Sequence, residues 1–226
     1  MRHLLAVIAV AASLFAAGRA SAGVVEIQAI VDKAKASIST LAIDPNLPAF
    51  KDYATQAKGI LIVPTMIKGG FIIGGSGGSG VLLIRMADGK SFSSPAFYTM
   101  GSVTLGLQIG GEVSEIALLL MTDDAVDSFL TTSAKLGGDV SIAAGPVGVG
   151  AKAQIVDVLA FSRTQGLYGG LNLEGAVVDV RDQWNREYYG TAVRPRDILV
   201  KQTVMNENAQ ALREAVAQAA APAAAK

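Results

Sequence analysis

The stretch GILIVPTMIKGGFIIGGSGGSGVLLIRM, residues 59–86, decides the fold that we predict for this chain. Short apolar runs rich in β-branched residues flank a glycine-rich segment, which is typical of β-strands. Asp88 and Gly89 follow after Ala87, and an Asp-Gly pair favours a tight hairpin turn. Because glycine inside a strand weakens it, the repeated glycines predict bulges, sharp bends or close approach of backbones.

The same texture continues to residue 181, since 22 of the 25 glycines lie between Gly59 and Gly175. One helix interrupts the strands, with Thr122 as its cap and Gly137 as its end. Helical spacing of apolar residues also marks residues 23–43, 47–57, 184–189 and 206–220. We therefore predict an α+β fold: a mainly antiparallel, glycine-rich β-sheet or partly closed barrel, with an N-terminal amphipathic helix, the interrupting helix and C-terminal helices.

The first 22 residues have the features of a cleavable signal peptide. A short positive start precedes the apolar stretch Leu4–Ala17, and Ala20-Ser21-Ala22 fits the small-x-small cleavage pattern. A stretch of 14 residues is shorter than the roughly 20 that span a bilayer. We expect cleavage after Ala22 and export to the periplasm or the extracellular space, with the product peripheral to a membrane. The predicted organisation is a signal peptide (1–22), one domain (23–204), and an alanine-rich helix with a frayed tail (205–226).

Composition excludes several kinds of chemistry. The chain has no cysteine, and its one histidine, His3, lies in the predicted leader. The mature chain then has no Ser-His-Asp triad, Cys-His nucleophile, His/Cys zinc site or disulfide. Residues 23–226 carry 17 basic and 19 acidic side chains, so we expect no nucleic acid partner. We predict no enzyme, cofactor or metal, although a Ser-Lys pair such as Ser133 and Lys135 stays open.

Three short motifs match known sites by letter only. Residues 75–80 satisfy G-x-G-x-x-G, but the apolar run that follows is a predicted strand and not the helix that holds a pyrophosphate. Residues 74–78 satisfy G-x-S-x-G, yet the mature chain has no histidine to act as the base. Asp123, Asp124 and Asp127 match D-D-x-x-D, but acids in the first turn of a helix are also favoured by its dipole.

Four blocks together resemble the SYLF domain, a lipid-binding family found in bacterial exported proteins and in eukaryotic proteins of membrane traffic and actin patches. They are AKGILIVPTMIKGGFIIGGSGGSGVLLIRMADGKSFSSPAF (57–97), LGGDVSIAAGPVG (136–148), FSRTQGLYGGLNLEGAVV (161–178) and NREYYG (185–190). The resemblance covers roughly residues 24–204. It implies a non-catalytic, phospholipid-binding domain.

Candidate lipid-binding residues come from two sources. The resemblance gives Lys58, Lys68 and Arg163, which match recurring basic positions of the family. Lys33 and Lys35 lie on the polar side of the predicted N-terminal helix, where a membrane-surface helix carries its lysines. The alternative is that the apolar stripe of this helix packs on the sheet and the lysines are merely solvated.

The leading hypothesis is thus a phospholipid-binding module of the bacterial cell envelope that contacts membranes through the N-terminal helix and nearby lysines. The alternative is a structural or interaction module that contacts another envelope protein through its glycine hairpins and the aromatic residues Trp184, Tyr188 and Tyr189. A small outer-membrane barrel is a third possibility, against which the interrupting helices count. Ser76 and Gln165 stand where some relatives of the family carry basic residues, and an exported protein would not meet actin, so we do not expect actin as a partner.

Overall fold

The described strands of the chain form one mainly antiparallel sheet. A computed structural model describes residues 23–70, 73–105, 110–145, 156–164 and 173–222; the predicted leader and residues 223–226 of the tail lie outside them. Its eight strands follow the order β5-β8-β3-β2-β1-β4-β7-β6, and only β6 and β7 run parallel. The bounds are β1 (Gly59–Gly70), β2 (Ile73–Ile84), β3 (Ala96–Leu105), β4 (Gly110–Leu120), β5 (Ser133–Lys135), β6 (Ile142–Ala144), β7 (Val158–Thr164) and β8 (Val177–Val180).

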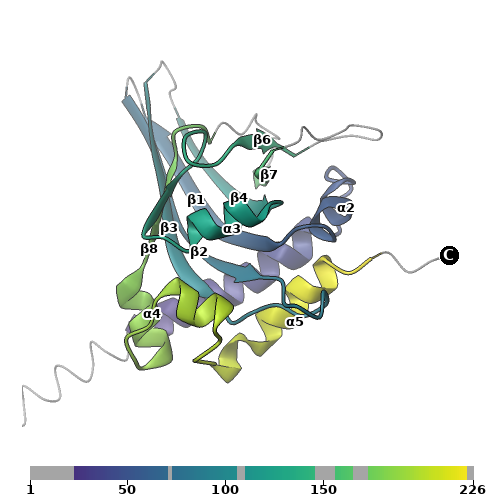
Figure 1. The fold of residues 1–226 in the computed structure, drawn as a ribbon. Helices are drawn as coiled ribbons and strands as arrows, with labels where there is room; N and C mark the ends of the chain where they lie inside the picture. The colour runs from purple at the N-terminus through teal and green to yellow at the C-terminus, as the bar shows by residue number, and fades with distance from the viewer. Residues whose placement is uncertain (1–22, 71–72, 106–109, 146–155, 165–172, 223–226) are drawn as a thin grey trace, which may run out of the picture.

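Helices pack around one end of this strongly curved sheet, as Figure 1 shows. The N-terminal helix covers residues 23–41. It is followed by α2 (Phe50–Ala54), α3 (Asp123–Phe129), α4 (Asp182–Tyr189), the π-helix η1 (Arg196–Val200), the 3-10 helix η2 (Glu207–Ala209) and α5 (Gln210–Ala219). The predicted α+β fold, with an interrupting helix and helices at both ends of the domain, is confirmed.

Two hydrophobic cores form because side chains alternate between the faces of each strand. In β1, Ile60 and Ile62 face the N-terminal helix, α2, α4 and α5, and we call this the outer face. Leu61 and Val63 point to the inner face, where α3 and η1 pack. Residues of α5 are buried in the outer core, although this helix lies beyond the predicted domain of residues 23–204.

The apolar stripe of the N-terminal helix is part of the outer core. Ile27, Ala34, Ile38 and Leu41 have no exposed surface. A stripe that is already buried against the sheet is not available to a bilayer, so the prediction that this helix contacts a membrane through its apolar side is wrong for the folded chain. The alternative, in which the stripe packs on the sheet, is confirmed, and the helix offers a partner only its polar sides.

The aromatic segment of α4 also belongs to the core. Trp184 and Tyr188 are buried and pack edge-on against Phe97 of β3. The buried amide oxygen of Asn185 accepts a hydrogen bond from the Phe97 N–H at 2.9 Å and so takes the place of a backbone carbonyl of a neighbouring strand. Gly190 then ends the helix in a left-handed conformation, φ 69°. The hypothesis that Trp184 and Tyr188 contact a partner protein is therefore wrong, because these rings have almost no free surface.

A bulge in β1 explains the glycines of β2. The register of β1 shifts between Ile62 and Thr65 relative to β2, and Pro64 lies in this irregularity, where a ladder donor is not needed. A Cβ on Gly80 would lie 2.4 Å from the Ile62 carbonyl oxygen, and one on Gly78 would lie 2.5 Å from that of Thr65. Close approach of two backbones, as the glycine content predicted, is confirmed at these two positions.

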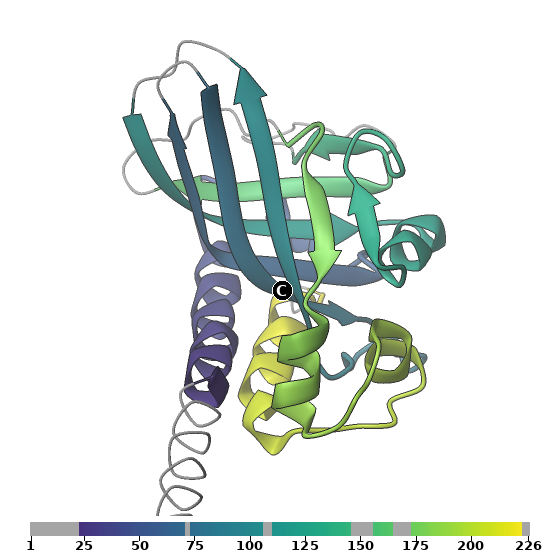
Figure 2. The same ribbon diagram turned by 90° about the vertical axis from the view of Figure 1, so that its left-hand side faces the viewer.

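Beyond the bulge the four long strands continue past the helices, as Figure 2 shows. We call residues 65–70, 73–80, 99–105 and 110–114 the distal half of these strands. On its outer face Ile67, Val103 and Val113 are exposed by 59%, 80% and 44%. Helices therefore cover one half of the outer face, and the distal half leaves apolar side chains in solvent.

Local turn and cap predictions have mixed outcomes. Asp88 accepts hydrogen bonds from two backbone N–H groups of the turn that contains Gly89, at φ 69°, and this confirms the turn. The Thr122 hydroxyl accepts from the Ala125 N–H, which confirms the cap of α3. The predicted end of this helix at Gly137 is wrong, because α3 ends at Phe129 and β5 intervenes.

Candidate functional site

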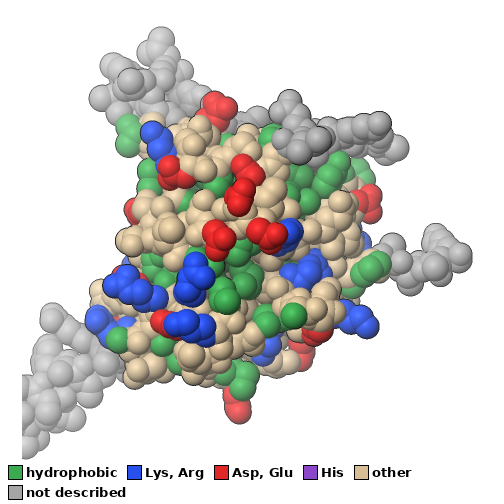
Figure 3. Space-filling model, in the orientation of Figure 1, with side chains coloured by type: hydrophobic (Ala, Val, Ile, Leu, Met, Phe, Trp, Pro, Cys, Tyr) green, Lys and Arg blue, Asp and Glu red, His purple; other side chains and the backbone are tan. Residues whose placement is uncertain are grey.

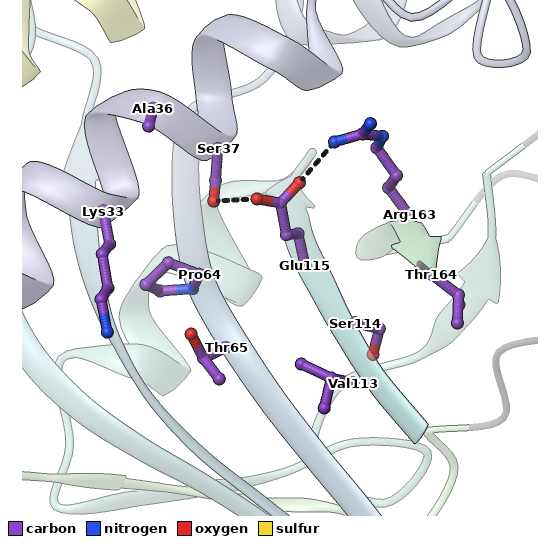
Figure 4. A pocket seen from close by; sticks show the side chains of 10 residues that line it. All are labelled: Lys33, Ala36, Ser37, Pro64, Thr65, Val113, Ser114, Glu115, Arg163 and Thr164. Atoms are coloured by element: carbon purple, nitrogen blue, oxygen red, sulfur yellow. Dashed lines mark hydrogen bonds and ion pairs between the residues drawn. The ribbon is translucent and has the colours of Figure 1, made fainter. Parts of the chain in front are cut away.

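The β1 bulge forms the floor of a pocket at the border between the covered and distal halves. Pro64 and Thr65 lie there beside the N-terminal helix. Lys33, Ala36 and Ser37 reach the same space, since positions i, i+3 and i+4 share one side of a helix. The pocket has a volume of about 270 Å³, and Figure 4 shows its lining from close by.

Strands β4 and β7 complete this pocket. Glu115 of β4 and Arg163 of β7 are directly paired across the ladder, so their side chains leave the sheet on the same face. Val113, Ser114 and Thr164 also line it. We call this cavity the Glu115 pocket, because the carboxylate of Glu115 lies between the helix and β7 (Figure 4).

Charged groups of both signs meet in the Glu115 pocket. The Ser37 hydroxyl donates to Glu115 Oε1 at 2.9 Å, and Arg163 Nη1 lies 3.4 Å from Glu115 Oε2. Arg163 Nε lies 3.4 Å from a carboxylate oxygen of the almost buried Asp44. Among the described residues Lys33 forms no ion pair, so its ammonium is available to a ligand.

The structure brings two of the five predicted basic residues together. Lys33 and Arg163 line the Glu115 pocket from opposite sides (Figure 4). Lys35 is exposed but lies two positions along the helix from Lys33, about 200° around its axis.

Lys58 and Lys68 lie at opposite ends of β1. Lys58 precedes this strand and pairs with Asp123. Lys68 is in the distal half, opposite Glu112 of β4. Ten residues of strand separate them by about 33 Å, so they do not share one headgroup.

Glu115 and Ser37 are the pocket residues that sequence reasoning missed. Glu115 lies on the same face of β4 as the buried Ala117 and Leu119, so an acidic residue interrupts the apolar face of this strand. Ser37 adjoins Ile38 in the buried stripe of the helix and is 1% exposed. A polar residue within an apolar stripe was the available signal at both positions.

The motifs set aside on sequence grounds have structural roles. Residues 75–80 lie inside β2, so a strand and not a helix follows the glycines. Asp123 pairs with Lys58, and Asp127 with Arg196. Figure 3 shows acidic side chains around α3 and basic ones over α4. Ser133 and Lys135 are exposed on β5, and neither lines the Glu115 pocket.

The described residues provide neither a membrane-spanning helix nor a cluster of metal ligands. None of the helices described here has the length and apolar character needed to cross a membrane. In the same part of the chain, no three His, Cys, Asp or Glu side chains are placed to hold a metal ion together.

Comparison with known proteins identifies similar chains. A model of the Ysc84 family, described as "Las17-binding protein actin regulator", matches residues 101–219. LAS seventeen-binding protein 3 of Saccharomyces cerevisiae is 36% identical over 156 residues, which are 66% of this chain and 34% of that protein. SH3 domain-containing YSC84-like protein 1 of Homo sapiens is 33% identical over 165 residues, 70% of this chain and 48% of that protein. No solved structure matches.

These matches correct one prediction and settle the family. The chain spans between about a third and a half of the length of these curated relatives. The name of the yeast relative refers to Las17 binding, and the family description refers to Las17 binding and actin regulation, so the prediction that actin is not a partner is wrong. The family is described by binding and regulation and not by a reaction. Because its model matches more than half of the residues, the chain belongs to the Ysc84 family, the family of the SYLF domain.

Proposed function

We propose that this chain is a non-catalytic phospholipid-binding module, which holds a headgroup in the Glu115 pocket and rests its distal half against the membrane surface. The observation that carries the proposal is the position of this pocket. Its basic residues Lys33 and Arg163 share the lining with Val113, and Val113 pairs across the ladder with the exposed Ile67. A polar pocket beside exposed apolar side chains matches the two layers of a membrane surface, headgroups and acyl chains.

The chemistry of the pocket supports binding over catalysis. The Ser37 hydroxyl donates to Glu115, an arrangement that elsewhere activates a nucleophile. Ser37 reaches the pocket but is only 1% exposed, so its hydroxyl offers a substrate almost no accessible surface. The pair therefore fixes the helix to the sheet and orients the carboxylate.

Cosedimentation with phospholipid vesicles tests this function. We expect the chain to sediment with vesicles that contain anionic phospholipid, and Lys33→Gln with Arg163→Gln to weaken binding by up to about thirty-fold, since each of the two basic side chains near an anionic surface contributes about 1 kcal/mol. Lys35→Gln is the matched control, because it removes the same charge from the same helix away from the pocket. Whatever residues 1–22 add to binding is equal in all variants. Binding that is absent, or equally strong in all variants, would contradict the proposal.

We also propose that the chain is exported to the cell envelope and loses residues 1–22. The support is the leader pattern alone. Expression in a bacterium, followed by fractionation and N-terminal sequencing, should give a periplasmic or extracellular product that starts at Gly23. A cytoplasmic product that keeps Leu4–Ala17 would contradict it.

A protein-interaction module is the second candidate function. The family description names Las17 binding and actin regulation, and its match spans β3 to α5. On this alternative the chain sediments with actin filaments, or binds an actin-regulating protein, in the absence of lipid. Binding to filaments that survives Lys33→Gln with Arg163→Gln, combined with no binding to vesicles, would favour this function over lipid binding.

A further inference from the structure

Resting on the proposed function, we infer that the Glu115 pocket selects a zwitterionic headgroup with a primary ammonium, of the phosphoethanolamine type. In this arrangement Glu115 accepts hydrogen bonds from the ammonium, and Lys33 contacts the phosphate. The inference adds a ligand class, and four features of the pocket carry it.

The first feature is the charge balance of the pocket. Lys33 and Arg163 contribute two positive charges to the lining, and Glu115 contributes one negative charge. Asp44 does not line the pocket, but it pairs with Arg163 and balances the second positive charge. A pocket for a polyanionic headgroup would carry an excess of basic groups. Equal numbers of both signs complement a ligand that is itself dipolar.

The second feature is the remaining capacity of the Glu115 carboxylate. An ionised carboxylate offers about four lone-pair sites, and among the described residues Glu115 uses one for the Ser37 hydroxyl and one for Arg163. The Arg163 contact is long, at 3.4 Å, and both side chains are partly exposed, so solvent screens it. Glu115 can therefore accept from an additional ammonium group without losing its anchor to Ser37.

The third feature separates a primary from a quaternary ammonium. Quaternary ammonium groups have no N–H donor and are recognised by aromatic rings. The described residues that line the pocket include no aromatic side chain, and Thr65 offers a hydroxyl acceptor from the bulge. This lining suits an N–H donor and gives choline no favourable surface.

The fourth feature is size and the position of the two charges. About 270 Å³ is slightly below the roughly 300–1,000 Å³ of pockets for drug-sized ligands, so the space suits a headgroup and not its acyl chains. Lys33 lies across the pocket from Arg163, beside Pro64 and Thr65 (Figure 4). Phosphate at Lys33 and ammonium at Glu115 place the two ends of the headgroup on two different elements.

Vesicles of three compositions test this inference: phosphatidylcholine alone, phosphatidylcholine with phosphatidylethanolamine, and phosphatidylcholine with phosphatidylglycerol. We expect about five-fold stronger binding with phosphatidylethanolamine than with phosphatidylcholine alone, as one partly exposed charged contact contributes. Glu115→Gln should abolish this preference, while Lys33→Gln should weaken binding to all compositions, since every lipid carries a phosphate. Lys35→Gln should leave both properties unchanged.

Other outcomes would contradict the inference, the proposed function or both. A phosphatidylethanolamine preference that persists in a folded Glu115→Gln variant reflects bilayer packing and overturns the inference, as does equal binding to all compositions. Binding to no vesicle at all overturns the proposed function as well. Soluble glycerophosphoethanolamine should compete with the vesicles; failure to compete would show that the headgroup is not what the pocket recognises.

Discussion

The two halves of the long strands differ in what covers their outer face. In the covered half, strand residues such as Ile62 and Leu119 pack against four helices and have no exposed surface. In the distal half, Ile67 and Val103 on the same face are open to solvent. Exposed apolar side chains on this face do not stabilise the fold, so under the proposed function the covered half provides stability and the distal half provides contact with the membrane.

The largest effect should come from the covered half. Ile38→Ala removes a buried side chain between the N-terminal helix and the sheet, and we expect a loss of about 3 kcal/mol in the free energy of unfolding. Val103→Ala, also in an apolar position but 80% exposed, should change stability by less than about 0.5 kcal/mol. Urea denaturation of both variants measures this difference. Equal losses would show that the distal half is also packed, against a partner copy or another segment.

The glycines of β2 sharpen the comparison at a finer scale. Gly80→Ala places a Cβ 2.4 Å from the Ile62 carbonyl oxygen, and we expect a loss of about 2 kcal/mol because backbone must shift. Gly77→Ala is the matched change in the same strand, where the nearest atom lies 3.9 Å away, and stability should change by less than about 0.5 kcal/mol. Denaturation midpoints of the two variants measure this difference in stability. If both variants lose the same stability, close approach of the backbones at the bulge is not the reason for glycine at position 80.

Sequence reasoning reached the strands and most helix positions, because these features have local causes. For the glycines it left bulges, bends and close approach open, since the register of β2 against the β1 bulge decides the role of Gly78 and Gly80. It did not reach the pocket, which combines Lys33, Glu115 and Arg163 from three elements that are far apart along the chain. It assigned the N-terminal helix to a membrane because periodicity shows an apolar side but not its partner.

A polar network at the covered end of the sheet predicts a pH effect. Hydrogen bonds from Ser141 and Thr122 lower the pKa of Asp157 below its usual 3.8. A lowered folded-state pKa stabilises the fold above the unfolded value, and this contribution disappears as the pH falls from about 4 through the folded-state pKa.

The matching variant is Asp157→Asn. After allowance for solvent screening, we expect it to cost about 1 kcal/mol at pH 7 and to flatten the loss of stability below pH 4. Thermal melts of both proteins between pH 7 and pH 2 measure the effect. Parallel curves over this range would contradict the assignment of the acid-sensitive contribution to Asp157.

The variant with the smallest expected effect on stability tests the distal half directly. Ile67→Ser removes one apolar side chain that is 59% exposed, so stability should stay within about 0.5 kcal/mol of the original. If this side chain enters the acyl region, its loss should weaken vesicle binding about five-fold, which corresponds to partial burial of one aliphatic group. Val25→Ser is the control, because Val25 is 67% exposed and lies in the first turn of the N-terminal helix. This end of the helix lies away from the distal half, as Figure 2 shows. Equal weakening of vesicle binding by both variants would mean that the membrane does not distinguish the two regions. Unchanged vesicle binding by Ile67→Ser would mean that this side chain does not contribute to the contact and would leave the Glu115 pocket to account for it.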